Sequence, residues 1–217
     1  MKLHIYFIAA AVAGAALSPA VVFAGGNAEA DPPTREPRSS DAPETSETLN
    51  AREMDASLRE LLAEIGVRTF DEEILAVDFG IPSLAGDETS LSDYSGEFVF
   101  LNFWATWCPP CREEMPSMGV MHQVLSDLPF QVVAIDVQES PEVVTSFVEE
   151  MGYSFPILLD ESGRVAANYG VRGIPTTYFI SPRGTVLGML VGTRYWDEPD
   201  ILATMREIAE IAQAARS

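Results

Sequence analysis

Two cysteines, three positions apart, constrain this chain more than any other feature. The 217-residue sequence contains only Cys108 and Cys111, which follow the apolar segment 98–104 and precede a predicted helix. A disulfide across so short a loop adds little stability, and disulfide-scaffolded small proteins carry several spread cysteines. The pair is therefore predicted to serve chemistry at a strand-to-helix junction, with an inert structural disulfide as the open alternative.

From residue 76 onward, apolar segments typical of strands alternate with amphipathic segments typical of helices. The predicted strands are 98–104, 131–137, 155–159, 176–180 and 185–191, and the predicted helices are 108–125, 164–169, one opening at Ser140-Pro141 with Val144, Phe147, Val148 and Met151 inward, and a terminal one around 201–208. A β-α-β half followed by a β-β-α half predicts an α/β fold with a central mixed β-sheet flanked by helices.

The sequence before this domain divides into three parts. Residues 1–24 have the layout of a secretory signal peptide with cleavage after Ala24, although an uncleaved membrane anchor has the same length. Residues 25–48 form an acidic, Pro-rich linker predicted to be disordered, because they contain almost no large apolar side chains. Residues 49–75 are predicted to be a helical extension of the domain that covers 76–217.

The predicted extension helix carries Leu58, Leu61, Leu62 and Ile65 at helical spacing. Ser57 and Glu60 suggest a capping box at its start, and Gly66 suggests its end. Packing against the main domain is the favoured interpretation of the apolar stripe, and a partner-binding helix is the alternative.

The charge of the chain excludes one class of partner. It carries 33 acidic and 13 basic residues, for a formal net charge of −20. Such a surface is repelled by nucleic acid and by anionic membrane surfaces, so no nucleic-acid partner is expected.

The position of the cysteines predicts their roles. Cys108, at a helix N-terminus, meets the positive end of the helix dipole, which favours the thiolate that attacks disulfides. We assign Cys108 as the exposed attacking thiol and Cys111 as the buried resolving thiol. Pro109 and Pro110 lack N–H donors, so they stabilise the thiolate less than a donor-rich loop would, and the couple is expected to be reducing.

Other uses of the cysteine pair fail on ligand count. A structural zinc site needs about four ligands, and His122 is the only histidine after the predicted signal peptide. Covalent haem attachment needs histidine directly after the second cysteine, where this chain has Arg112. We therefore expect no metal and no cofactor beyond a redox-active Cys108–Cys111 disulfide.

The segment Asn102 to Pro116, NFWATWCPPCREEMP, resembles the TlpA/ResA-like branch of the thioredoxin superfamily, which includes the DsbE/CcmG proteins of cytochrome c maturation. Two further segments match the same branch, DFGIPSLAG at 78–86 and GVRGIPTT at 170–177. The resemblance covers about residues 76–215 and implies a thioredoxin-like fold.

The resemblance also implies roles for single residues. Pro175 is expected to be a cis-proline that faces the dithiol and exposes the Ile174 backbone to a substrate peptide. Glu114 matches a buried acid that could carry the proton of Cys111, although a first-turn glutamate that answers the helix dipole is the alternative. Trp107 is expected at the surface, where it could contact substrate, and Asn102 replaces the buried aspartate of ordinary thioredoxin.

The resulting expectation is a periplasmic or otherwise extracytoplasmic reductase of protein disulfides. By resemblance, apocytochrome c is one possible client, a DsbD/CcdA-type membrane protein one possible electron donor, and a membrane tether is possible. The alternatives are a disulfide oxidase or isomerase, a Sco-like copper-binding module, for which CxxC is the wrong spacing, and an adaptor that uses the extension helix. A peroxiredoxin is disfavoured because no cysteine lies outside the CxxC pair.

Overall fold

The structure, a computed structural model, describes residues 46–214 and residue 216. Its helices are α1 (Ser46–Glu64), the 3₁₀ turn η2 (Leu91–Tyr94), α2 (Pro109–Val124), α3 (Pro141–Met151), α4 (Arg164–Asn168) and α5 (Pro199–Ala214). Its strands are β1 (Arg68–Leu75), β2 (Gly80–Pro82), β3 (Glu88–Ser90), β4 (Phe98–Trp104), β5 (Phe130–Val137), β6 (Ile157–Asp160), β7 (Thr176–Ile180) and β8 (Thr185–Val191). The predicted signal segment and nearly all of the predicted linker lie outside the described residues.

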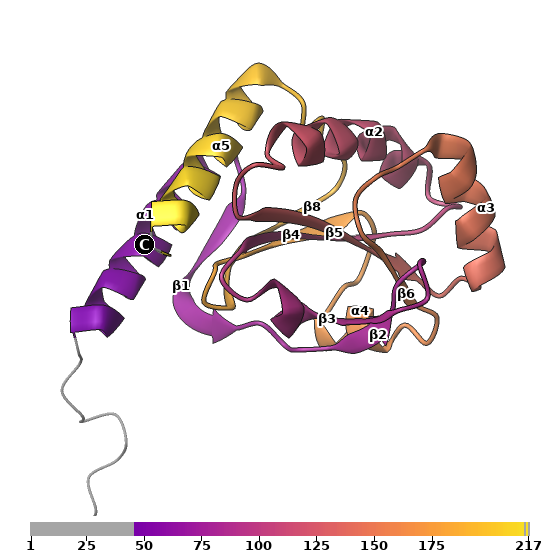
Figure 1. The fold of residues 1–217 in the computed structure, drawn as a ribbon, viewed down its shortest axis with the longest axis horizontal. Coiled ribbons are helices and arrows are strands. Elements are labelled where there is room, and N and C mark those ends of the chain that lie inside the picture. Colours follow the sequence, from indigo (N-terminus) through magenta and orange to yellow (C-terminus); the bar gives the residue numbers. More distant parts are fainter. Residues whose placement is uncertain (1–45, 215, 217) are drawn as a thin grey trace, which may run out of the picture. The chain divides into compact units, whose positions relative to one another are not determined.

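Six strands form one sheet in the order β1-β8-β7-β4-β5-β6 (Figure 1). The pairs β4–β5 and β5–β6 are parallel, whereas β4–β7, β7–β8 and β8–β1 are antiparallel. Parallel neighbours need a long crossover, and α2 and α3 provide the two crossovers. The predicted α/β fold with a central mixed sheet flanked by helices is confirmed.

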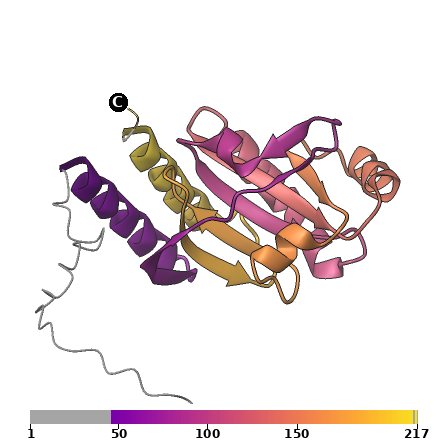
Figure 2. The same cartoon turned by 90° about the horizontal axis from the view of Figure 1, so that it is seen from below.

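Strand β4 lies at the centre of the sheet and is buried along its whole length. Because side chains alternate along a strand, Phe100 and Trp104 belong to the core under α1, α2, α3 and α5, whereas Leu101 and Phe103 belong to the core on the α4 side. Figures 1 and 2 show the helices on these two faces. Each fully buried Leu or Phe contributes roughly 1.5–3 kcal/mol, so β4 is a rigid base for the loop that follows it.

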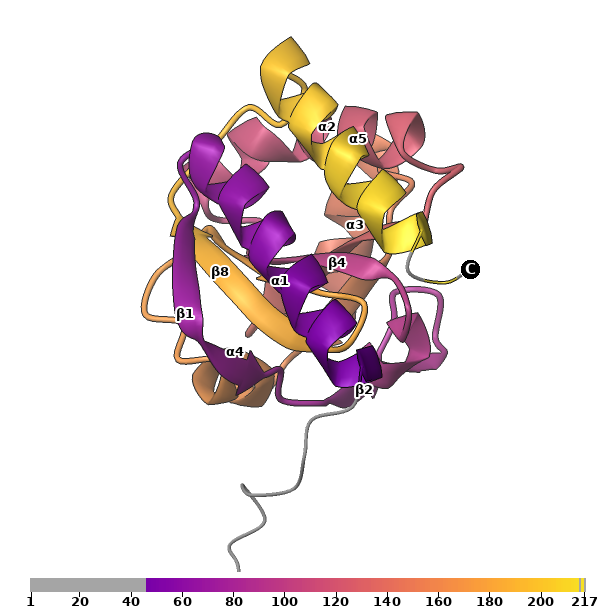
Figure 3. The ribbon, with the colours of Figure 1, turned by 90° about the vertical axis from the view of Figure 1, so that its left-hand side faces the viewer.

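Helix α1 is longer than the sequence suggested. It begins at Ser46, so Ser57 lies in its interior, where the hydroxyl donates to the carbonyl of Glu53 at 3.2 Å. The predicted capping box at Ser57 is therefore wrong, since serine also bonds the preceding turn from within a helix. Leu58 and Leu62 are fully buried and α1 lies beside α5 (Figure 3), which confirms the packing interpretation.

Residues 68–75, assigned above to a helical extension, form strand β1 of the main sheet instead. The pattern hid this strand, because β1 is an acidic, largely exposed edge strand with a register shift between Thr69 and Ile74. Gly188 lets β1 approach β8, since a Cβ there would lie 2.6 Å from the carbonyl oxygen of Arg68.

Smaller differences concern α3 and the entry to β4. Val144 and Val148 face the core as predicted, but Met151, the last residue of α3, is 43% exposed. Ser140 has the extended backbone of an N-cap, yet its hydroxyl makes no capping hydrogen bond. The short β2–β3 pair was not predicted.

Among the described residues, no helix has the length and apolarity needed to cross a membrane.

Candidate active site

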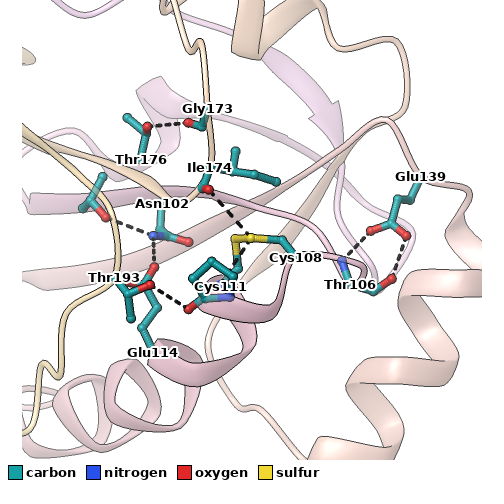
Figure 4. The surroundings of a disulfide bond; sticks show 12 residues. Asn102, Thr106, Cys108, Cys111, Glu114, Glu139, Gly173, Ile174, Thr176 and Thr193 are labelled. Atoms are coloured by element: carbon teal, nitrogen blue, oxygen red, sulfur yellow. Dashed lines mark hydrogen bonds between the residues drawn. A yellow bond between two sulfur atoms is a disulfide. The ribbon is translucent and has the colours of Figure 1, made fainter.

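Cys108 and Cys111 form a disulfide at the start of α2, directly beyond the buried strand β4 (Figure 4). Cys108 is the N-cap of the helix, and its Sγ accepts a hydrogen bond of 3.3 Å from the backbone N–H of Cys111. An N-cap acceptor is served by the N–H groups of the second and third helical residues. The second is Pro110, which has no N–H, so one of the two capping donors is missing.

The exposure of the two cysteines differs from the prediction. Cys111 is fully buried as expected, but Cys108, predicted to be exposed, is only 3% exposed. Its sulfur is covered because it turns inward to Cys111 and to the segment around Ile174. The exposed surface belongs to the neighbouring Trp107, which is 66% exposed, and to Pro109 and Pro110.

A cis peptide bond joins Ile174 to Pro175, as the resemblance implied. The carbonyl oxygen of Ile174 lies 3.8 Å from the Sγ of Cys108. A disulfide sulfur has no proton to give, so this is a contact, and a Cys108 thiol at the same place could donate to that carbonyl. The carbonyl of Pro175 is held by the N–H of Gly192 at 2.9 Å. The cis-proline segment therefore faces the attacking position.

Glu114 is fully buried and points back from α2 toward β4. Its Oε1 accepts from the side-chain amide of Asn102 at 2.9 Å, and its Oε2 accepts from the backbone N–H of Arg194 at 3.1 Å. Burial raises the pKa of Glu114 to about 7, against the lowering effect of the Arg194 N–H, the Asn102 amide and the indole of Trp196. The neighbouring Glu113 is exposed. A carboxyl group that titrates near neutrality is suited to proton transfer.

The connection between β8 and α5 also belongs to the site, which the sequence analysis missed. Besides the Arg194 N–H, the hydroxyl of Thr193 donates to the carbonyl of Pro110 at 3.1 Å, and the backbone N–H of Trp196 donates to Ser117 Oγ at 2.9 Å. Two of these three donors are backbone groups, which every residue except proline provides. No sequence signal could have identified them.

A second contact that the sequence analysis missed holds the loop before the cysteines in place. Glu139 follows β5, and its carboxylate accepts from both the backbone N–H of Thr106 at 2.5 Å and the hydroxyl of Thr106 at 2.6 Å. Thr106 lies two residues before Cys108 (Figure 4). The acidic residues 136 and 139, placed just where a buried strand ends, were the available signal.

The other residues singled out in the sequence have structural surroundings. Trp104 is fully buried, as expected of a core residue. His122 is partly buried and meets the ring of Phe155 edge-on, which agrees with a packing role. Within residues 46–214 and 216, no three His, Cys, Asp or Glu side chains are grouped as metal ligands would be.

Comparisons with known proteins agree on the nature of this site. The AhpC/TSA family model matches residues 75–189. The thiol-disulfide oxidoreductase ResA of Geobacillus thermodenitrificans is 41% identical over 118 residues, which cover 54% of this chain and 68% of the relative. A putative thiol:disulfide interchange protein DsbE from Chlorobium tepidum has 33% identity and a TM-score of 0.59, covering 65% of this chain and 99% of that one. A secreted thiol-disulfide isomerase from Corynebacterium glutamicum has 25% identity and a TM-score of 0.58, covering 65% and 90%.

Proposed function

Because this chain belongs to the AhpC/TSA family and is a ResA-like thiol–disulfide oxidoreductase of the thioredoxin superfamily, we propose that it reduces disulfides of client proteins through Cys108 and Cys111. The observation that carries this proposal is the Cys108–Cys111 disulfide at a helix N-terminus, with the cis-proline segment on one side and a buried acid on the other. The sequence has no third cysteine for a separate peroxide-reducing thiol.

The reaction begins from the reduced protein. The Cys108 thiolate attacks one sulfur of the client disulfide, forms a mixed disulfide and releases the other client sulfur as a thiolate. Cys111 then loses its proton and attacks Cys108, which closes the internal disulfide and releases the second client thiolate. Two electrons pass to the client, and an upstream dithiol must return two electrons to this protein.

Glu114 is proposed to accept the Cys111 proton in the second step. It lies one helical turn after Cys111 and its raised pKa, about 7, lets it exist in both protonation states near neutral pH. Asn102 and the Arg194 N–H hold the carboxylate in place. The client segment is proposed to bind two groups of residues around the disulfide. One group is exposed and consists of Trp107, Pro109 and Pro110. The other faces Cys108 and consists of Ile174 and Pro175.

The direction of electron flow is argued from the capping donors. Among the backbone donors of the described residues, only the Cys111 N–H reaches the Cys108 sulfur, because Pro110 cannot donate at the other capping position. Weaker stabilisation of the thiolate disfavours the reduced form and gives a more reducing couple. A disulfide oxidase or isomerase is the second candidate, and the name of the similar Corynebacterium protein, a secreted thiol-disulfide isomerase, favours the isomerase.

We place the protein outside the cytoplasm. The signal-like residues 1–24 support this location, with cleavage or retention as an anchor both open, and the similar Corynebacterium protein is described as secreted. Apocytochrome c is proposed as one client class and a DsbD/CcdA-type membrane protein as the electron donor, both by the resemblance stated above.

A trapping experiment tests the proposal. Cys111→Ser should leave the mixed disulfide unresolved, so clients accumulate in covalent complexes that mass spectrometry can identify. Cys108→Ser, the matched control, should capture none. The proposal fails if Cys108→Ser captures the same clients, or if neither variant captures any while the wild-type protein reduces insulin at full rate. A measured reduction potential near that of known oxidases would transfer the assignment to the second candidate.

A further inference from the structure

A buried carboxyl group near the active site makes no hydrogen bond of ordinary geometry. Asp136, near the end of β5, is fully buried, and within the described part of the chain neither of its carboxyl oxygens has a partner at ordinary hydrogen-bond distance and angle. The indole N–H of Trp104, on the neighbouring strand in register with Asp136, is also unpaired, so it does not serve this acid. A buried carboxylate without donors is costly, which favours the protonated acid.

The groups that act on Asp136 are themselves acidic. Burial raises the pKa of Asp136 to about 8, and the side chains of Glu139, three residues later, and Asp160, at the end of the neighbouring strand β6, act in the same direction, against the lowering effect of the Glu139 backbone N–H. Asp160 is already served by the backbone N–H of Ala166 and the hydroxyl of Ser162. On the helix side, Arg112 of α2 is exposed and lies over the Phe147 ring, 5.5 Å from its centroid. No cation is among the groups that act on the Asp136 carboxyl, so no positive charge takes the place of its proton.

Glu139 can accept a hydrogen bond from a protonated Asp136 and hold Thr106 at the same time. Each carboxylate oxygen has two lone pairs, and the Thr106 N–H and hydroxyl use one on each oxygen. Proton sharing between two carboxyl groups is the expected solution where a buried acid lies beside a partly buried one, as Asp136 does beside Glu139.

We propose that the protonated carboxyl group of Asp136 donates a hydrogen bond to the Glu139 carboxylate. This acid pair positions Thr106 and, through Thr106, the attacking Cys108. Both acids are positioning residues, because neither is placed on a reacting sulfur. The expected effect on the reactivity of Cys108 rests on the proposed function, whereas the protonation of Asp136 does not. The pair is distinct from Glu114, which lies on α2 and is held by Asn102 and Arg194.

The proton is tested by NMR on the oxidised full-length protein, where the cysteines do not titrate. The ¹³C signal of the Asp136 carboxyl, assigned by its loss in Asp136→Asn, should report a protonated acid at pH 6. The Thr106 amide signal should shift with a midpoint near pH 8 in the wild-type protein and stay constant in Asp136→Asn, because the amide keeps a donor for Glu139 at all pH values. The inference is overturned if Asp136 is ionised at pH 6 or if the Thr106 shift is the same in both proteins.

The positioning role is tested by the reaction of reduced Cys108 with a small disulfide such as DTNB. Glu139→Ala and Asp136→Ala should slow the reaction roughly tenfold at pH 7, the effect of about one lost hydrogen bond on a rate. Asp136→Asn should recover most of that loss, which a cavity effect alone would not explain. Glu142→Gln, an exposed acid on α3, is the matched control and should react like wild type.

The two tests fail separately. If the NMR result holds while Glu139→Ala and Asp136→Ala react at the wild-type rate, the proton pair exists but does not position Cys108. If instead Cys108→Ser still captures clients, the proposed function fails while the NMR result keeps its meaning.

Discussion

The side-chain amide of Asn102 donates one hydrogen bond to Glu114 and another to Thr177, both of 2.9 Å. Asn102 and Thr177 are cross-strand partners on β4 and β7, so the sheet itself fixes the amide. The amide in turn holds the buried acid of α2. This arrangement joins the central strand, the cis-proline strand and the active-site helix at one carboxyl group.

Removing the Asn102 amide should therefore raise the pKa of Glu114 further. The amide stabilises the charged carboxylate, so in Asn102→Ala the pKa should move above its present value of about 7. A hydrogen bond to a charged group corresponds to about one pH unit or somewhat more. A ¹³C titration of the Glu114 carboxyl in the oxidised protein measures this shift. An unchanged or lower midpoint would contradict the assigned role of Asn102.

Replacing Glu114 should slow the second chemical step. Glu114→Gln cannot accept the Cys111 proton, so resolution of a preformed mixed disulfide should fall about a hundredfold, the lower range of acid–base catalysis. In the wild-type protein this rate should rise with pH through about 7, where Glu114 becomes a carboxylate, and the rise should vanish in the variant. Stopped-flow fluorescence follows the step. Glu113→Gln, an exposed neighbour, should keep the wild-type pH profile.

Supplying the missing capping donor should make the couple more oxidising. In Pro110→Ala the second helical residue gains an N–H aimed at Cys108 Sγ, which stabilises the thiolate of the reduced form. A gain of one hydrogen bond of about 1 kcal/mol corresponds to roughly 20 mV in a two-electron couple. Equilibration with glutathione measures the potential. Pro109→Ala is the control, because the first helical residue does not serve the cap, and an equal shift there would refute the argument.

The oxidised protein should lose stability as the pH rises. The pKa of Glu114 is raised in the folded state from 4.5 to about 7, so between these values the folded state binds more protons than the unfolded state. The free energy of unfolding then falls with increasing pH, by roughly 3 kcal/mol at most for this group. Urea unfolding at pH 5 and pH 8 measures the difference. Glu114→Gln should be less sensitive to pH than wild type, and a fall of equal size would contradict the prediction.

Helix α1 should contribute to the stability of the whole domain. Leu62 is fully buried in the main core, so Leu62→Ala should lower the free energy of unfolding by about 2–5 kcal/mol. Leu49, on the same helix but 47% exposed, is the control, and Leu49→Ala should have little effect. Chemical denaturation of both variants compares them. If Leu62→Ala unfolds like wild type, α1 is an independent appendage.

Local sequence determined much of the domain and the centre of its site. Strands β4, β7 and β8 were predicted at their observed boundaries, because they are apolar and bounded by turn residues. The helix start at the cysteines was predictable for the same reason, since a cysteine at an N-cap followed by two prolines is a local signal. The acidic, exposed strand β1 was not predictable, because its pairing partner β8 lies far away in the sequence.

The chemistry around the cysteines was decided by the tertiary structure. Sequence identified Glu114 by resemblance, but its pKa depends on burial and on a backbone N–H eighty residues later. Three further features likewise depend on which segments the sheet brings together. They are the burial of Cys108, the hydrogen bonds between Glu139 and Thr106, and the unpaired carboxyl group of Asp136. A sequence pattern encodes the helices, strands and turns that local side chains favour. Charge states depend on solvent exclusion and on donors from distant segments, and these exist only once the chain has folded.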